Sequence, residues 1–221
     1  MSLTSVYRAF IWDFDGTLYD TYPHTVRAYA ETLAEYGFEG DAAEIERIAR
    51  ISLLELKRHL KARFGVPREY FEKVEARALE LAIANAKPFP DARRFLEDVV
   101  GEGGVNLLFT HRDRTALDIL ESGDMLRLFA DTVFDGDPDF VWKPSGKSIK
   151  ALIRRNGLKK PETIMVGDRE IDVESAAKAK TDSCIIMPYD ITADSVATYK
   201  CESFAAFRAV LGGQSGKQTV N

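Results

Sequence analysis

Five short apolar runs constrain the fold of this 221-residue chain more than any other feature. Each run ends in a polar or glycine-bearing turn and is followed by helix-like sequence. The runs are AFIWD (9–13), VNLLFT (105–110), DTVFDG (131–136), TIMVGD (163–168) and DSCIIMP (182–188). Runs that are apolar at almost every position suit parallel strands covered on both faces by helices. The pattern therefore predicts an α/β fold with a doubly wound, Rossmann-like parallel sheet.

A long insertion separates the first two runs. Roughly ninety residues lie between them, far more than a crossover between parallel strands needs. Most of this stretch predicts helices; Asp41 with Glu44, and Ser52 with Glu55, match the spacing of a capping box. The prolines of KPFPD (87–91) end the last of these helices and mark the return to the sheet. The predicted parts are an α/β core at 1–19 and 87–212, an all-helical domain at 20–86, and a disordered tail at 213–221.

Composition and charge exclude several classes of function. The formal net charge of -5 offers no basic field, so we expect no nucleic-acid partner. No apolar run approaches the roughly 18 residues of a membrane span, and the N-terminus does not match a secretory signal, so no membrane association is expected. Cys184 and Cys201 lie outside any CxxC pair, which argues against a disulfide framework or a zinc site. We expect a cytoplasmic protein, monomeric by default, with a dimer left open.

Polar residues gather where the apolar runs end. Ligands of open parallel sheets bind beyond the carboxyl ends of the strands, so these residues are the candidate site. They are Asp13, Asp15, Gly16 and Thr17 after the first run, Thr110, His111 and Arg112 after the second, Lys143 after the third, and Asp168 and Asp172 after the fourth. Neighbouring carboxylates repel one another unless a cation lies between them, and oxygen ligands with a substrate phosphate suit Mg²⁺. A lysine and a hydroxyl stand beside these carboxylates. The group therefore predicts phosphoryl transfer, in which a carboxylate can attack the phosphate.

Four segments resemble, in order, the motifs of the haloacid dehalogenase superfamily in its phosphatase branch. They are DFDGT (13–17), FTHRD (109–113), WKPSGKSIKALI (142–153) and VGDREID (166–172). The resemblance extends from about Arg8 to Gly212 and includes the helical insertion, which this family calls its cap. It implies a phosphatase with a small helical cap, similar to phosphoglycolate phosphatases.

The resemblance also implies a role for each main residue. Asp13 would be the nucleophile and a Mg²⁺ ligand. Asp15 would bind the metal through its backbone carbonyl, which leaves its carboxyl free to protonate the leaving oxygen and then activate water. Asp168 would complete the metal ligands. Thr110 would hydrogen-bond the phosphoryl group, and Lys143 would neutralise its charge and that of Asp13.

Secondary roles follow from the same resemblance. Asp172 would orient Lys143 or a metal-bound water, although Asp168 and Asp172 also suit capping of the helix that begins near Arg169. Gly16 would let the backbone approach the phosphate closely. His111 stands where the family often has asparagine, and its expected contact is the substrate or the cap.

Two regions are open to other interpretations. Tyr22 and Arg50, in the cap, are candidate substrate-binding residues, with a purely structural role as the alternative. The family often has glycine after a helix at the position where this chain has Ala179, Lys180 and Thr181. The resemblance therefore does not predict the conformation of this turn.

The implied reaction is Mg²⁺-dependent hydrolysis of a small phosphate ester, of the phosphoglycolate or sugar-phosphate type, through an aspartyl-phosphate. A phosphomutase of the β-phosphoglucomutase type would use the same acids. A haloacid dehalogenase proper attacks carbon without magnesium and lacks an acid equivalent to Asp15, which disfavours it here. A non-catalytic binding or regulatory protein on the same fold is the alternative from another class.

Overall fold

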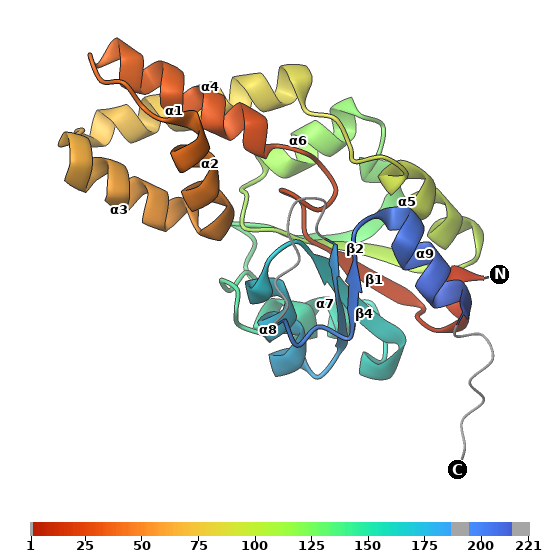
Figure 1. Ribbon diagram of the computed structural model, residues 1–221. Helices are drawn as coiled ribbons and strands as arrows, with labels where there is room; N and C mark the ends of the chain where they lie inside the picture. Colours follow the sequence, from red (N-terminus) through yellow and green to blue (C-terminus); the bar gives the residue numbers. More distant parts are fainter. Residues whose placement is uncertain (1, 187–194, 214–221) are drawn as a thin grey trace. The chain divides into compact units, whose positions relative to one another are not determined.

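The computed structural model describes residues 2–186 and 195–213, and it contains a six-stranded parallel sheet (Figure 1). Contacts divide the chain into two units, Met1–Tyr19 with Pro88–Asn221, and Asp20–Lys87. The strands are β1 (Ala9–Trp12), β2 (Val105–Phe109), β3 (Phe129–Val133), β4 (Thr163–Gly167), β5 (Asp182–Ile186) and β6 (Tyr199–Cys201). Their order is β3-β2-β1-β4-β5-β6, and every neighbouring pair is parallel. The predicted doubly wound sheet is confirmed.

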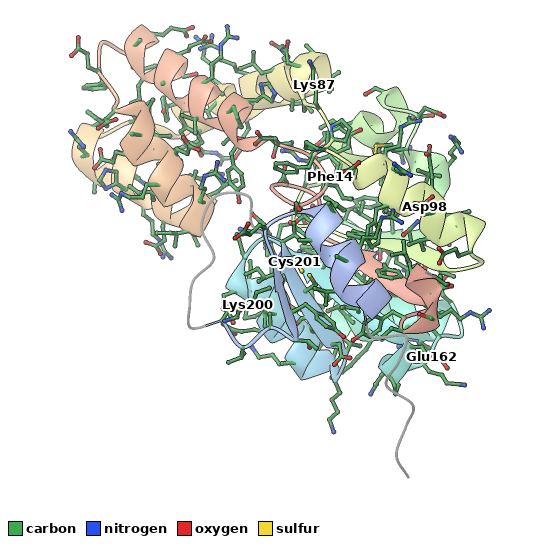
Figure 2. All side chains as sticks on the ribbon, turned by 45° about the vertical axis from the view of Figure 1, so that its right-hand side comes forward. Phe14, Lys87, Asp98, Glu162, Lys200 and Cys201 are labelled. Carbon is green, nitrogen blue, oxygen red and sulfur yellow. The ribbon has the colours of Figure 1, made fainter. Side chains whose placement is uncertain are left out.

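Helices cover both faces of this sheet (Figure 1). Those of the first unit are α5 (Ala92–Gly101), α6 (Thr115–Ser122), α7 (Lys147–Arg155), α8 (Glu170–Ala179) and α9 (Phe204–Gly213), with short 3-10 helices η1 (Leu3–Ser5), η2 (Leu126–Leu128) and η3 (Lys160–Glu162). Helices α5 and α9 contact each other on one face, while α7 and α8 pack together on the other. Asp98 of α5, labelled in Figure 2, pairs with Arg208 of α9 at 2.6 Å.

The central strand β1 shows why the sheet is buried on both faces. All of its residues are buried, and alternate side chains point to opposite faces. Trp12 stacks on Phe204 of α9, with ring centroids 5.7 Å apart, and meets Phe95 of α5 edge-on at 5.4 Å. Ile11 instead belongs to the apolar cluster that includes Leu152 of α7. An uninterrupted apolar run is therefore what this position requires.

Two strands differ from the sequence expectation. The run predicted at 131–136 begins earlier as strand β3, at Phe129, and its second half is a turn in which the Asp135 N–H donates to the Arg112 carbonyl at 3.0 Å. Strand β6 was not predicted, because three residues with an exposed Lys200 in the middle form no apolar run (Figure 2). It forms because it pairs with β5, where Ile186 faces Cys201.

The second unit consists of helices whose starts follow the sequence signals. They are α1 (Tyr22–Glu35), α2 (Ala42–Ile51), α3 (Leu53–Phe64) and α4 (Arg68–Asn85). The Asp41 carboxylate accepts the N–H of Ala43 at 2.9 Å, and Ser52 Oγ accepts the N–H of Glu55 at 3.4 Å, so both residues are N-caps. The glutamates of the two expected capping boxes pair elsewhere, Glu44 with Arg63 and Glu55 with Arg58. Gly65 ends α3 in the left-handed conformation, with φ +65°.

Parts of the sequence expectation lie outside the described residues. The predicted tail is one, since Gly213 ends α9 and residues 214–221 are not described; the end of the fifth run, at 187–188, is another. Among the described helices, none combines the length and the apolar character needed to cross a membrane.

Candidate active site

The strand order brings three motif residues to one edge of the sheet. Strand β1 lies between β2 and β4. After β1 the chain adds β2 and β3 on one side, and it then adds β4, β5 and β6 on the other. The carboxyl end of β1 is therefore the topological switch point of the sheet. Asp13, Thr110 and Asp168 directly follow these three strands. The Asp13 N–H still donates to the Val166 carbonyl at 2.9 Å, which holds its backbone in the sheet. The side chains after three neighbouring strands thus share one edge.

Lys143 is a fully buried cation at this edge. Its Nζ lies 2.5 Å from Asp13 Oδ1 and 2.6 Å from Asp172 Oδ1, and its side chain is 0% exposed. Burial acts to lower the pKa of Lys143, but the carboxylates of Asp13 and Asp172 outweigh it and raise the pKa above the ordinary value. The lysine is therefore an ammonium ion that bridges two carboxylates.

Three buried carboxylates lie at this edge, and Lys143 pairs with two of them, Asp13 and Asp172. Asp13, Asp168 and Asp172 each offer an oxygen, and these oxygens lie within 4.8 Å of one another. Burial raises the pKa of Asp13 to about 6 despite the opposing charge of Lys143. Burial raises the pKa of Asp168 to about 8 despite Arg169, and the charge of Asp13 adds to the rise. Three carboxylates stand against the two cations Lys143 and Arg169, so without a further cation they are not all ionised, and the all-oxygen donor set fits a hard divalent cation such as Mg²⁺.

Asp172 has two partners in the structure. Its Oδ1 pairs with Lys143, and its Oδ2 accepts the Arg169 N–H at 3.2 Å, the contact that an acidic residue at the third position of a capping box makes, at the start of α8. The contacts that helix capping and orientation of Lys143 require thus occur in one side chain, and the role of Asp172 in orienting Lys143 stays a prediction. Gly167 makes room for it, because a Cβ at Gly167 would lie 2.2 Å from Asp172 Cγ.

Arg112 binds the carboxylate of Asp15. Its Nε lies 3.1 and 3.2 Å from the two Asp15 oxygens, and its Nη2 lies 2.5 Å from Oδ1. Burial acts to lower the pKa of Arg112, but the Asp15 carboxylate outweighs it and raises the pKa. Sequence reasoning placed Arg112 at this edge without a role. The available signal was its position two residues after Thr110, matching that of Asp15 two residues after Asp13 on the neighbouring strand.

Thr110 and His111 both contact the loops that form the site. Thr110 is buried, and its Oγ1 accepts the Arg112 N–H at 3.0 Å, which leaves its hydroxyl proton to donate elsewhere. His111 Nε2 accepts the backbone N–H of Lys143 at 2.8 Å, and its ring meets Trp142 with centroids 4.6 Å apart. Burial, with Lys143 adding, lowers the pKa of His111 to about 3, so the ring is neutral. His111 therefore fixes the Lys143 backbone; its contact with substrate or cap stays a prediction.

Gly16 lies in the tight turn that follows Asp13. Its φ is +80°, and its N–H donates to the Tyr19 carbonyl at 2.9 Å. The carbonyl of Phe14, labelled in Figure 2, accepts the N–H of Tyr19 at 3.1 Å, which closes the turn. Thr17 Oγ1 donates to Asp13 Oδ2 at 3.4 Å. The geometry explains the glycine through its positive φ, and the close approach of a phosphate to Gly16 stays a prediction.

Tyr22 and Arg50 contact each other within the helical unit. The Arg50 Cζ lies 4.5 Å from the centroid of the Tyr22 ring, a cation–π distance. Arg50 Nη2 also lies 2.6 Å from Glu46 Oε1, one turn earlier on α2. These contacts fix the guanidinium on the aromatic ring. The predicted role of both residues in substrate binding stays a prediction.

Residues 10–186 match the model of the haloacid dehalogenase-like hydrolases. The chain belongs to this family. It is an enzyme of the phosphatase branch. A phosphoglycolate phosphatase from Aquifex aeolicus (strain VF5) is 26% identical over 186 residues, covering 81% of this chain and 84% of the relative. A hydrolase structure from Streptococcus pneumoniae TIGR4 is 26% identical with TM-score 0.67, covering 94% of this chain and 99% of that one.

A further structure shows the same fold at lower identity. It is a HAD family hydrolase from Deinococcus radiodurans R1, solved with bound phosphate and sodium. It is 16% identical with TM-score 0.78, and the match covers 96% of this chain and 97% of that one. At this identity the likeness concerns the fold alone.

This haloacid dehalogenase-like hydrolase forms one turn without the glycine that the family often has there. Lys180 ends α8 in the left-handed conformation, with φ +66°, and its N–H donates to the Ala177 carbonyl at 3.1 Å. A non-glycine residue in this conformation costs about 1–2 kcal/mol. The end of α8 is also tightly packed, because a Cβ at Gly146, just before α7, would lie 2.5 Å from the backbone nitrogen of Ala179. The departure in sequence therefore leaves the turn intact.

Proposed function

We propose that this hydrolase is a Mg²⁺-dependent phosphatase that cleaves a small phosphorylated metabolite through an aspartyl-phosphate. The observation that carries the proposal is the buried Lys143 that bridges Asp13 and Asp172 at 2.5 and 2.6 Å, at the switch point of the sheet. A carboxylate held by a buried ammonium ion is a suitable nucleophile, and the same ammonium ion stabilises charge on a phosphoryl group. Asp15, two residues further, supplies the acid and base.

The proposed reaction has one covalent intermediate and two proton transfers. An oxygen of Asp13 attacks phosphorus, the bond from phosphorus to the ester oxygen breaks, and the leaving oxygen takes a proton from Asp15. The Asp15 carboxylate then accepts a proton from water, whose oxygen attacks phosphorus, releases inorganic phosphate and restores Asp13. Lys143 and the hydroxyl of Thr110 stabilise the phosphoryl oxygens throughout, since such catalysis rests on positioning and charge.

The proposed metal ligands are the side chains of Asp13 and Asp168 and the backbone carbonyl of Asp15. When bound, Mg²⁺ supplies the positive charge that this edge lacks and neutralises charge on the phosphate. We assign Asp172 to the orientation of Lys143 rather than to the metal, because Lys143 and the Arg169 N–H already hold its two oxygens.

The proposed substrate is phosphoglycolate or a sugar phosphate of similar size. Two relatives, 26% and 24% identical, are phosphoglycolate phosphatases, which makes phosphoglycolate the first ester to test. We propose that residues 20–86 act as the cap that excludes bulk water and selects the substrate. Tyr22 and Arg50 are our candidates for that selection.

The direct test is phosphate release from p-nitrophenyl phosphate, phosphoglycolate and several sugar phosphates, with Mg²⁺ and with EDTA. We expect Asp13→Asn to lower kcat by at least about a thousandfold, because it removes the nucleophile. Asp118→Asn, on the exposed face of α6, is the matched control and should keep wild-type activity. Equal rates for the wild type and Asp13→Asn would overturn the assignment of the nucleophile.

The same measurement separates the rival functions. A phosphomutase protects its phospho-enzyme from water, so steady phosphate release without a sugar bisphosphate would exclude that alternative. If no ester is hydrolysed in Mg²⁺, the mutase or the non-catalytic protein becomes the better interpretation. Activity that persists in EDTA would contradict the metal requirement.

A further inference from the structure

We propose that Arg112 is a positioning residue that fixes the carboxyl group of Asp15 for its two proton transfers. This inference rests on the proposed function, because it concerns the acid and base of that reaction. The ion pair between Arg112 and Asp15 is the observation that carries it.

The contact between the two side chains is a fork. Two different nitrogens of Arg112, Nε and Nη2, reach the Asp15 carboxylate, at 3.1 Å and 2.5 Å from Oδ1, and Nε also lies 3.2 Å from Oδ2. Contacts from two nitrogens of a planar guanidinium restrict both the position and the rotation of a carboxylate. A single ammonium contact would leave the carboxyl group free to rotate. The arrangement therefore determines the direction in which Asp15 presents a proton.

Arg112 is itself held in place from several sides. Its N–H donates to Thr110 Oγ1 at 3.0 Å, and its carbonyl accepts the Asp135 N–H at 3.0 Å. Its guanidinium carbon lies 5.7 Å from the centroid of the Phe14 ring, and only 17% of its side chain is exposed. These contacts connect the end of β2 to the turn after β1. Asp15 is thereby fixed relative to Asp13 by a path that does not depend on the helical unit.

The main alternative is that Arg112 binds the substrate phosphate directly. Its Nε–H and one N–H of Nη2 already donate to Asp15, so only the remaining N–H groups of Nη1 and Nη2 could reach a phosphate while the fork is kept. Lys143 already provides a buried cation beside Asp13. The geometry therefore favours action through Asp15, and the two possibilities make different predictions.

The first test compares leaving groups. We expect Arg112→Gln to lower kcat/KM for an alkyl phosphate by about ten- to a hundredfold, because the acid is misplaced. The loss should be smaller for p-nitrophenyl phosphate, whose leaving group departs without a proton. The kcat/KM of Arg112→Lys should lie between the values for Arg112→Gln and for the wild type, because a lysine restores the charge but not the fork. Arg208→Gln, which removes the 2.6 Å pair with Asp98 between α9 and α5, is the matched control and should match the wild type.

The second test is a double-mutant cycle with Asp15→Asn. If Arg112 acts only through Asp15, Arg112→Gln will cause no further loss of kcat in the Asp15→Asn background. Binding of inorganic phosphate, measured by calorimetry, should also be unchanged in Arg112→Gln. Losses that multiply, together with weaker phosphate binding, would overturn the inference in favour of a direct phosphate contact.

The outcomes separate this inference from the function on which it rests. A wild-type protein that hydrolyses no ester would overturn the proposed function and the inference with it. An active wild type, an impaired Asp15→Asn and an unaffected Arg112→Gln would overturn the inference alone. If circular dichroism shows that Arg112→Gln is unfolded, Arg112→Lys decides: a larger loss for the alkyl phosphate than for p-nitrophenyl phosphate supports positioning, and equal losses overturn it.

Discussion

Replacement of Lys143 by methionine tests the central feature of the site. Methionine keeps the length and the apolar stem of the side chain, so the packing changes little while the charge is lost. The ammonium group that lies 2.5 Å from Asp13 and 2.6 Å from Asp172 would be gone, and both carboxylates would stay buried. We expect the metal-free protein to be strongly destabilised.

The size of this effect follows from the burial of Lys143. Loss of one partner from a buried ion pair costs about 3–5 kcal/mol. In a chain of 150–250 residues, 1 kcal/mol changes the melting temperature by roughly 2–4 °C. Lys143→Met should therefore melt roughly 6–20 °C below the wild type at alkaline pH. The difference should shrink in acid, because protonation removes the charge of the unpaired carboxylates.

The assay is thermal denaturation followed by circular dichroism, in EDTA at about pH 8.5 and about pH 5. Lys150→Met, at an exposed position of α7, is the matched control and should change the free energy of unfolding by at most about 0.5 kcal/mol. Adding Asp172→Asn to Lys143→Met should restore part of the stability, since it removes one unpaired charge. A melting temperature within about 2 °C of the wild type at alkaline pH would refute the reasoning.

Three further predictions use other features of the site. In EDTA, the free energy of unfolding measured with urea should fall as pH rises from about 4 to about 8. The raised pKa values of Asp13 and Asp168 make the folded state hold more protons than the unfolded state over this range, so a free energy that rises with pH would contradict the prediction. Lys180→Gly should raise the free energy of unfolding by about 0.5–1 kcal/mol in the same assay, since glycine accepts φ +66° without strain. Gly167→Ala should lower kcat for phosphate release at least about tenfold, because its Cβ would displace Asp172; an unchanged kcat would refute this contact.

Local signals in the sequence were sufficient for the parallel sheet and for several helix starts. A run such as AFIWD is apolar throughout because β1 is covered on both faces, and this requirement is visible without knowledge of the partners. The caps at Asp41 and Ser52 use hydrogen bonds that span two or three residues. Strand β6 was missed because it depends on pairing with β5 rather than on its own composition.

The sequence by itself determined which chemical groups follow the strands: Asp13, Thr110 and Asp168 stand at the ends of apolar runs. Only the tertiary structure decided how these groups pair. The fork between Arg112 and Asp15 joins residues 97 positions apart, and His111 accepts the N–H of Lys143 from 32 positions away. Such contacts depend on the order of the strands and on the path of the loops between them. Composition and periodicity describe local preference, whereas the partner of a buried charge is set by whichever segment the folded chain brings beside it.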